Sequence, residues 1–197
     1  MIPRHLILGA VVMIVLALSM SFYACHIRGG ASQPESASTQ PVAPPVSGRT
    51  EPVTLYVAYD DGEVLRAQSA RIPLPAGRQE RAEELLRALL SIYLDRSSPH
   101  ILGAGSEIRD VYLVDPGLAV IDLNAAFADG HRSGVLIEEL TVASLVETLS
   151  ANIPGITRAK ILVDGKERDT LSGHLDLTNF YDVAAFSQLV QQLQSAR

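Results

Sequence analysis

The sequence contains one cysteine, Cys25, and no tryptophan, and aromatic residues make up only 5% of its 197 residues. A lone cysteine excludes a disulfide within the chain. Few aromatic rings are present to stack against sugars or bases. Lysine and arginine number 16 against 22 aspartates and glutamates, so the net charge is −6 and the clustered basic surface typical of nucleic-acid binding is missing. We therefore expect no nucleic-acid partner.

Sequence motifs of the common catalytic sites are missing as well. The chain has no G-x-S-x-G elbow, no phosphate-binding loop and no H-E-x-x-H zinc motif. Its single thiol, Cys25, is far in sequence from the histidines of the folded part. Nucleophilic catalysis therefore lacks a candidate, and we expect a protein that is not an enzyme and has no catalytic residues, cofactor or metal site.

Apolar residues concentrate near the N-terminus, where residues 6–24 form the uncharged run LILGAVVMIVLALSMSFYA. Its length is close to the roughly 20 residues that a helix needs to cross a bilayer. A cleaved signal peptide ends in small residues, but Phe22 and Tyr23 stand at that place and are typical of a membrane interface. The sequence therefore predicts that residues 1–25 form an uncleaved, single-pass transmembrane helix.

The flanks of this run predict its orientation and raise an alternative. Arg4 and His5 lie in a very short N-terminal tail, which favours a cytoplasmic N-terminus and a domain on the extracytoplasmic, periplasmic side. Cys25 follows the run directly, so a lipoprotein signal is the alternative to a plain anchor. Phe22 argues against lipidation, because lipoprotein processing usually requires a small aliphatic residue there. Either way the cytoplasmic membrane holds the domain.

Residues 26–52 are rich in Pro, Ser, Gly and Ala and predict a flexible linker. A folded domain is expected over residues 53–182, and an amphipathic C-terminal helix over residues 183–197. Alternation of apolar residues predicts strands, and apolar residues at helical spacing predict helices. The expected strands are 53–59, 62–74, 107–115, 118–124, 157–163 and 166–171, and the expected helices are 78–93 and 133–152, the second capped by Ser133.

This order of elements, β-β-α-β-β-α-β-β, predicts an α+β fold. Helices that follow hairpins pack together on one face of a sheet. We therefore expect a two-layer sandwich of a mixed or antiparallel sheet with two main helices on one face. The helix over residues 133–152 is apolar around much of its girth, which predicts that it is buried.

Four stretches of the domain resemble a known family. They are TLYVAYDDGEVL, RAEELLRALL, VYLVDPGLAVIDLNAAFADG and ANIPGITRAKILVDGKERDTLSGHLDLTNFY. In the last stretch, PGITRAKILVDGKE followed by LSGHLDL keeps the family's spacing throughout. On these residues the chain resembles the GerMN domain family of sporulation and spore-germination proteins.

The resemblance implies an extracytoplasmic domain of the bacterial cell envelope, found after an anchor, in tandem or fused to other modules. It implies no enzymatic activity. The compact fold of the family is similar to the ring-building motifs of sporulation secretion-like channels, which implies assembly with other proteins.

Histidine and carboxylate side chains gather at two places, Asp129 with His131 and His174 with Asp176. Such groups could bind a metal ion or exchange protons. Their spacing is not diagnostic, because His174 follows a glycine at a turn and Asp176 alternates with leucines as an outward-facing strand residue. We interpret the four residues as structural, and a hydrolase that uses His174 and Asp176 is the alternative.

Two further features have structural interpretations. Glu138 and Glu139 are neighbours on one helix and point about 100° apart, so they cannot form a paired-carboxylate site by themselves and are interpreted as solvated or capping charges. The loop Gly103-Ala104-Gly105-Ser106 could offer amides to an anion. Loops of this kind are more often simple connectors, and we assign no site to it.

Two non-catalytic functions are consistent with the sequence. The first is assembly, in which the domain binds itself or another envelope protein through a sheet edge or a helical face. The second is binding of peptidoglycan or another wall glycan, for which Tyr56, Tyr59, Tyr93 and Tyr112 could form stacking surfaces. The low aromatic content favours assembly.

Overall fold

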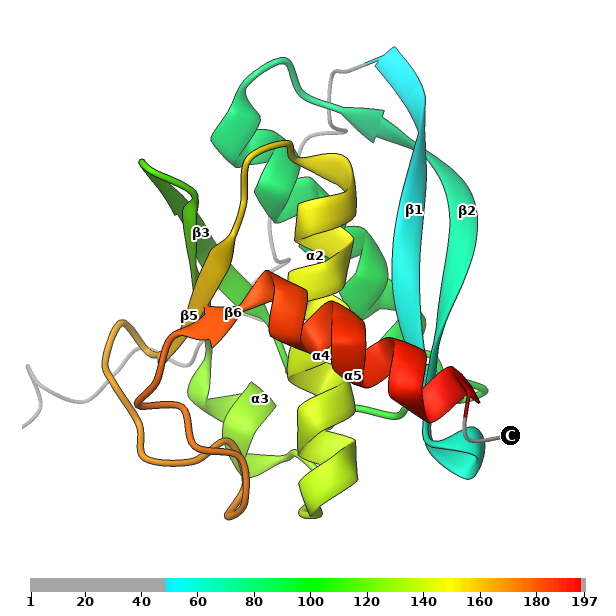
Figure 1. Ribbon diagram of the computed structural model, residues 1–197, viewed down its shortest axis with the longest axis vertical. Coiled ribbons are helices and arrows are strands. Elements are labelled where there is room, and N and C mark those ends of the chain that lie inside the picture. Colours follow the sequence, from blue (N-terminus) through cyan, green and yellow to red (C-terminus); the bar gives the residue numbers. More distant parts are fainter. Residues whose placement is uncertain (1–48, 196–197) are drawn as a thin grey trace, which may run out of the picture. The chain divides into compact units, whose positions relative to one another are not determined.

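The computed structural model describes residues 49–195, and Figure 1 shows how their elements are arranged. An antiparallel hairpin comes first and helix-and-strand units follow. In chain order the elements are β1 (Arg49–Tyr59), the 3-10 turn η1 (Asp60–Gly62), β2 (Val64–Leu74), α2 (Arg78–Tyr93), β3 (Ile108–Val114), β4 (Leu118–Leu123), α3 (Ala125–Asp129), α4 (Val135–Asn152), β5 (Arg158–Val163), β6 (Tyr181–Asp182) and α5 (Val183–Ser195).

The strands form two separate sheets. β1 and β2 pair with each other in a two-stranded sheet, and the second sheet has the order β3-β4-β5-β6. β4 and β5 run parallel because α4 connects them, whereas the other neighbours are antiparallel. The predicted α+β class is therefore confirmed, but the predicted single sheet is wrong.

Side chains from two helices close the outer edge of β1, which explains why it does not join the second sheet. The side-chain amide of Asn152 accepts from the backbone N–H of Thr54 at 3.0 Å and donates to its carbonyl at 2.7 Å. The hydroxyls of Thr148 and Tyr93 accept from the next two outward-facing N–H groups, each at 2.9 Å. Backbone groups on that edge thus have partners without another strand.

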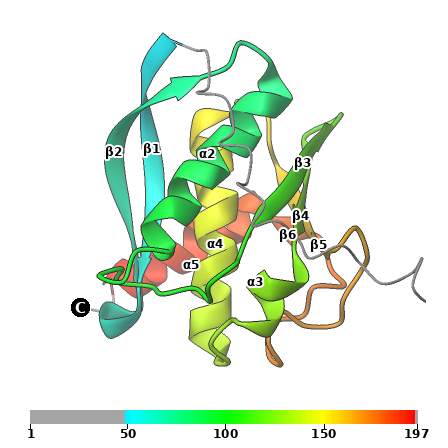
Figure 2. The ribbon, with the colours of Figure 1, turned by 180° about the vertical axis from the view of Figure 1, so that it is seen from behind.

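Helices α2 and α4 lie between the hairpin and the four-stranded sheet, as both views show (Figures 1 and 2). The helices thus form a middle layer with one sheet on each side, whereas the prediction had one sheet and one helical layer. α4 is buried around most of its girth, as predicted, and even Thr141 and Ser144 are fully covered. The inner faces of both sheets and the two helices share one apolar core.

The turn between β3 and β4 is the predicted Asp115-Pro116-Gly117 sequence, and its glycine is required by two neighbours. Gly117 has φ of +76°, and a Cβ added there would lie 2.6 Å from the carbonyl oxygen of Gly155. The carbonyl of Gly117 also accepts hydrogen bonds from the N–H groups of Thr157 and Arg158 at 2.8 and 3.0 Å. The turn therefore fixes the start of β5.

Several predicted boundaries are corrected. β1 begins at Arg49, inside the predicted linker, where Glu51 forms an ion pair of 2.8 Å with Arg81. Gly134, not Ser133, caps α4. Helix α3 was not expected, although the side chain of Asn124 accepts from the N–H of Phe127 as an N-cap does.

The predicted strand over residues 166–171 is wrong. After the turn at Asp164 and Gly165 only two isolated bridges form, between Val163 and Lys166 and between Thr170 and Asp176. The segment up to β6 is otherwise irregular. The backbone N–H groups of Ser172, His174 and Leu175 in this segment donate to the side chain of Glu138 and not to a neighbouring strand.

No helix within residues 49–195 is long and apolar enough to cross a membrane. The predicted anchor, residues 1–25, lies outside the described residues, as does the linker up to residue 48.

Candidate functional site

A buried carboxylate ties α4 to the irregular segment that precedes β6. Glu138 lies in the first turn of α4 and its exposed fraction is 0%. Its Oε2 accepts hydrogen bonds from the backbone N–H groups of Ser172, His174 and Leu175 at 3.0, 3.1 and 2.9 Å. Its Oε1 accepts from the N–H of Gly134 at 3.2 Å. The segment thus wraps its amides around the carboxylate and forms an anion nest.

These donors determine the charge of Glu138. Burial raises the pKa of the carboxyl group, but the backbone N–H groups and the His174 side chain outweigh burial and lower the pKa of Glu138 to about 2. The side chain is therefore an anion at neutral pH. Of the two interpretations of Glu138, the solvated charge is wrong, because sequence alone does not show that a loop 34 residues away folds over it. The capping charge agrees with the hydrogen bond from the N–H of Gly134, the N-cap of α4.

A second buried polar cluster surrounds Thr141, on the same helix. The Thr141 hydroxyl oxygen lies 2.7 Å from Nε2 of both His100 and His131. Nδ1 of His100 lies 2.6 Å from a carboxylate oxygen of Asp60, and Nδ1 of His131 lies 2.7 Å from the carbonyl oxygen of Arg132. The cluster joins η1, α4 and the loops on either side of the second sheet's first hairpin.

The order of carboxylate, imidazole and hydroxyl in this cluster matches that of a hydrolase triad. Its Thr141 hydroxyl, however, is 0% exposed and its oxygen lies 2.9 Å from the carbonyl oxygen of Ile137, so a substrate has no access to it. Burial lowers the pKa of His100 and of His131, while Asp60 and the Arg132 carbonyl act in the opposite direction. The geometry supports a structural cluster.

The histidine and carboxylate residues singled out from the sequence do not form one site. Asp129 pairs with Arg168 at 2.7 Å, and His131 belongs to the Thr141 cluster. His174, half-exposed, contacts Glu138, whereas Asp176 accepts from the backbone N–H of a nearby threonine at 2.8 Å. Within residues 49–195 no group of three or more His, Cys, Asp or Glu side chains could hold a metal ion.

The other sequence candidates also have structural surroundings. Gly103 packs against Gly130, and the N–H of Ser106 donates to the carbonyl of Gly103 at 3.2 Å, so this amide is already bound. Of the four tyrosines considered for stacking, Tyr93 is fully buried and Tyr112 is 44% exposed. Tyr56 and Tyr59 are partly buried against the core.

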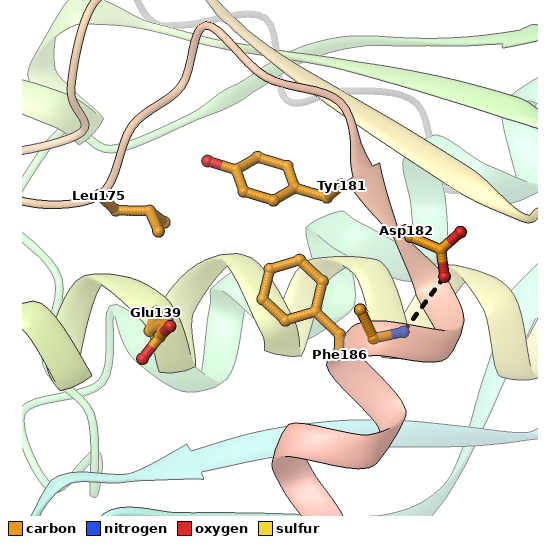
Figure 3. A pocket seen from close by; sticks show the side chains of 6 residues that line it. Glu139, Leu175, Tyr181, Asp182 and Phe186 are labelled. Carbon is orange, nitrogen blue, oxygen red and sulfur yellow. Dashed lines mark hydrogen bonds between the residues drawn. The ribbon is translucent and has the colours of Figure 1, made fainter.

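A pocket of about 330 Å³ lies between α4, β6 and the first turn of α5 (Figure 3). The rings of Tyr181 and Phe186 form part of its wall, with their centroids 5.2 Å apart. The full lining consists of Leu175, Tyr181, Ala185 and Phe186 with the carboxylates Glu139 and Asp182. Sequence reasoning missed this site, because these residues belong to α4, β6, α5 and the irregular segment before β6, and no motif connects them.

The outer face of the four-stranded sheet is a second exposed feature. Tyr112 stands opposite Val120, and Val114 opposite Leu118, on the face away from the helices. Tyr112 and Val114 are 44% and 47% exposed, and Phe180, just before β6, is 56% exposed. We call this surface the outer sheet face. Alternation along β3 could have identified Tyr112 and Val114, but not Phe180, which lies outside the strands.

The fold and these features define an α+β domain whose two sheets enclose helices α2 and α4 and whose buried polar clusters join its loops. A family model, Germane, described as sporulation and spore germination, matches residues 54–169. This match covers more than half of the chain. The chain belongs to the Germane family, and the predicted resemblance to GerMN domains is confirmed.

Two solved structures with TM-scores of at least 0.50 show the same fold. The first GerMN domain of the sporulation protein GerM from Bacillus subtilis has a TM-score of 0.50 and 22% identity, over 66% of this chain and 95% of that chain. The tandem GerMN domains of the same protein have a TM-score of 0.51 and 18% identity, over 68% of this chain and 46% of that chain. A Clostridium perfringens protein, provisionally named a lipoprotein, has a TM-score of 0.45 and 19% identity, over 72% of this chain and 92% of that chain. No curated protein matches the sequence.

Proposed function

We propose that this chain is a single-pass, membrane-anchored protein whose extracytoplasmic domain acts without catalysis in the assembly of cell-envelope proteins. The domain binds itself or another envelope protein through the outer sheet face. The observation that carries this proposal is the exposure of Tyr112, Val114 and Phe180 on one side of the sheet. Membership of a sporulation and germination family supports a function in the envelope.

The composition of the outer sheet face suits a protein interface. Its aromatic and aliphatic side chains on β3 and β4 adjoin charged residues of β5. Leu118 pairs with Arg158 and Val120 with Lys160, and both cations lie next to the ring of Phe180. Arg109 pairs with Asp164 at 3.1 Å beside the sheet. Interfaces commonly have an apolar centre and a polar rim, and tyrosine is frequent among the residues that contribute most to binding. An exposed apolar patch on a soluble domain is itself a frequent sign of an interaction site.

Absence of catalysis is supported by the surroundings of the best acid-base candidates. Thr141 is enclosed, and the Glu138 carboxylate is occupied by backbone amides. Residues 6–24 support the anchor through their length and lack of charge. The position of Arg4 and His5 supports a cytoplasmic N-terminus.

The experiment introduces a photo-crosslinking residue at Tyr112 of the full-length chain in intact cells. The matched control places it at Ser69, which is exposed on β2 in the other sheet. We expect a defined cross-linked product, a dimer or a complex with one envelope protein, at Tyr112 only. The substitution Val114→Asp, made together with the probe, should remove the product because a charge disfavours an apolar contact.

Binding of peptidoglycan is the alternative, since the exposed ring of Tyr112 could also stack on a sugar. Full-length protein in detergent would then sediment with purified cell wall, and Tyr112→Ala would abolish sedimentation. That result, combined with equal cross-linking from Tyr112 and Ser69, would overturn the assembly proposal.

A further inference from the structure

We propose that the pocket between α4, β6 and α5 binds an arginine side chain presented by a partner protein. This pocket is a different site from the outer sheet face, so the inference goes beyond the proposed function and does not depend on it. Three features carry it: the size of the pocket, its aromatic wall and its two carboxylates.

The size of the pocket limits the ligand. Its volume of about 330 Å³ is at the lower end of the roughly 300–1,000 Å³ found for small-molecule sites. A single long side chain suits this space better than a nucleotide or a run of sugars. Leu175 and Phe186 would cover the apolar stem of such a side chain (Figure 3), together with Ala185, which also lines the pocket.

The charges at the pocket select a cation. Glu139 on α4 and Asp182 at the end of β6 both line it, and neither forms an ion pair with another described residue. Arg158, the strand neighbour of Asp182, lies over the ring of Phe180 instead, at 5.7 Å. Burial and the carboxylates of Asp176, Glu138 and Glu139 together raise the pKa of Tyr181, which indicates a negative potential at this wall.

The aromatic wall favours a guanidinium over an ammonium group. Tyr181 and Phe186 present neighbouring rings, and the Tyr181 hydroxyl is held by the carbonyl of Asp176 at 2.5 Å. A planar guanidinium can stack on such a ring and donate at the same time to carboxylates on either side. Lysine can do only one of these well, because its charge is a compact point.

The test uses isotope-labelled full-length protein in detergent micelles and follows the methyl signals of Ala185 and Leu175. The probes are N-acetyl-arginine amide and its lysine, leucine and glutamate counterparts. We expect the arginine probe to shift both signals with half-saturation at about 1–10 mM, because one cation–π contact and partly exposed ion pairs bind weakly. The lysine probe should bind more weakly, and the leucine and glutamate probes should not shift the signals.

Two variants and one matched control test the carboxylates. Glu139→Gln combined with Asp182→Asn removes both charges, and asparagine still caps α5 in the way that the Asp182 carboxylate accepts from the N–H of Ala185. We expect this double variant to weaken the arginine probe by about tenfold or more. Glu107→Gln changes an exposed carboxylate next to β3 and should leave binding unchanged.

If the double variant does not fold, the proposal is tested by the salt dependence of arginine-probe binding to the unaltered protein. Binding of the arginine probe should weaken as ionic strength rises toward about 1 M, because salt screens exposed charges. The proposal is overturned if the arginine probe shifts neither methyl signal at about 50 mM. It is also overturned if the leucine probe, or soluble peptidoglycan fragments without a cationic group, bind as well as arginine. Neither result would bear on cross-linking at Tyr112, so the two proposals can fail separately.

Discussion

Glu138 and Thr141 lie less than one turn apart on α4, and both are fully buried. The cluster around Glu138 nevertheless favours a charged side chain, whereas the cluster around Thr141 favours neutral ones. Around Glu138, fixed backbone N–H groups stabilise a full negative charge and lower the pKa of the carboxyl group to about 2. Around Thr141, burial lowers the pKa of both histidines and so favours their neutral forms. Burial alone therefore does not decide whether a group is charged.

The difference lies in the number and type of partners. Backbone amides around Glu138 are donors only, and they point at one carboxylate from two segments of the chain. The Thr141 cluster consists mainly of side chains that can donate or accept. Its carboxylate, Asp60, already pairs with Arg132 at 2.7 Å, and Glu138 acts on His131 from outside the cluster. A single neighbouring carboxylate that is shared with an arginine does not offset the cost of burying an imidazolium.

The largest effect is expected from Glu138→Gln. The amide keeps the shape of the side chain, but it removes the charge and brings an NH2 group against backbone donors. We expect the free energy of unfolding to fall by about 3–5 kcal/mol, because hydrogen bonds to a charged group contribute about 1.5–3 kcal/mol each and the backbone donors that face the new NH2 group lose their acceptor. Urea unfolding of the full-length protein measures this change. Glu139→Gln, on the next residue, should cost no more than about 0.5 kcal/mol.

The same variant also changes the response to acid. Since the pKa of Glu138 is lowered in the folded protein, its contribution to stability is complete above the unfolded value of 4.5 and is lost as pH falls toward 2. This contribution is about 3 kcal/mol, from 1.36 kcal/mol for each unit. Glu138→Gln should lack that part of the pH dependence. Equal acid sensitivity in both proteins would contradict the role assigned to the nest.

The next largest effect is expected from Thr141→Val, which replaces the hydroxyl by a methyl group of similar size. It leaves the Nε2 atoms of His100 and His131 without their shared partner. Because the hydroxyl has one proton, it can donate to only one of the two neutral rings. One unsatisfied buried polar group costs about 1–3 kcal/mol, so we expect a loss of about 1–3 kcal/mol in thermal or urea unfolding. Thr141→Ser keeps the hydroxyl and should lose about 1 kcal/mol for one methyl group. Equal losses would show that packing, not hydrogen bonding, matters there.

A smaller effect is expected from the histidines as pH falls. Their pKa values are lowered in the folded protein, so the unfolded chain binds protons more readily just below the ordinary value of 6.5. The contribution of the two histidines to the free energy of unfolding is therefore complete above pH 6.5. It is lost as pH falls from 6.5 toward their lower pKa values in the folded protein. Ring-nitrogen NMR shifts across this range measure the titration. A ring of His100 or His131 that is charged at pH 7 would contradict this assignment.

Sequence periodicity could predict the regular elements but not how they combine. Helix 78–93 and the β3–β4 hairpin were found because their apolar spacing and turn residues are local signals. The division into two sheets was not, since it depends on Asn152 reaching Thr54, 98 residues away. A strand was predicted over residues 166–171 because alternation does not reveal that the following amides bind Glu138.

The candidate sites show the same limit. Sequence proximity grouped Asp129 with His131 and His174 with Asp176, but the fold directs the four side chains to different partners. The pocket beside Phe186 gathers residues from α4, β6 and α5, for which no spacing rule exists. Tyr112 and Tyr93 were both candidates for stacking on a ligand, and only the structure shows that Tyr112 is exposed and Tyr93 buried.

The smallest effect is expected from His174→Ala, which separates the two kinds of donor at Glu138. The His174 side chain is 44% exposed and its Nδ1 lies 3.1 Å from Oε1 of Glu138, whereas its backbone N–H remains in the variant. We expect a loss of about 1 kcal/mol or less in urea unfolding, because solvent screens the exposed imidazole. A loss as large as that of Glu138→Gln would mean that the imidazole, and not the set of backbone amides, holds the carboxylate. The contrast with the Thr141 cluster would then disappear, because both clusters would depend on histidine side chains.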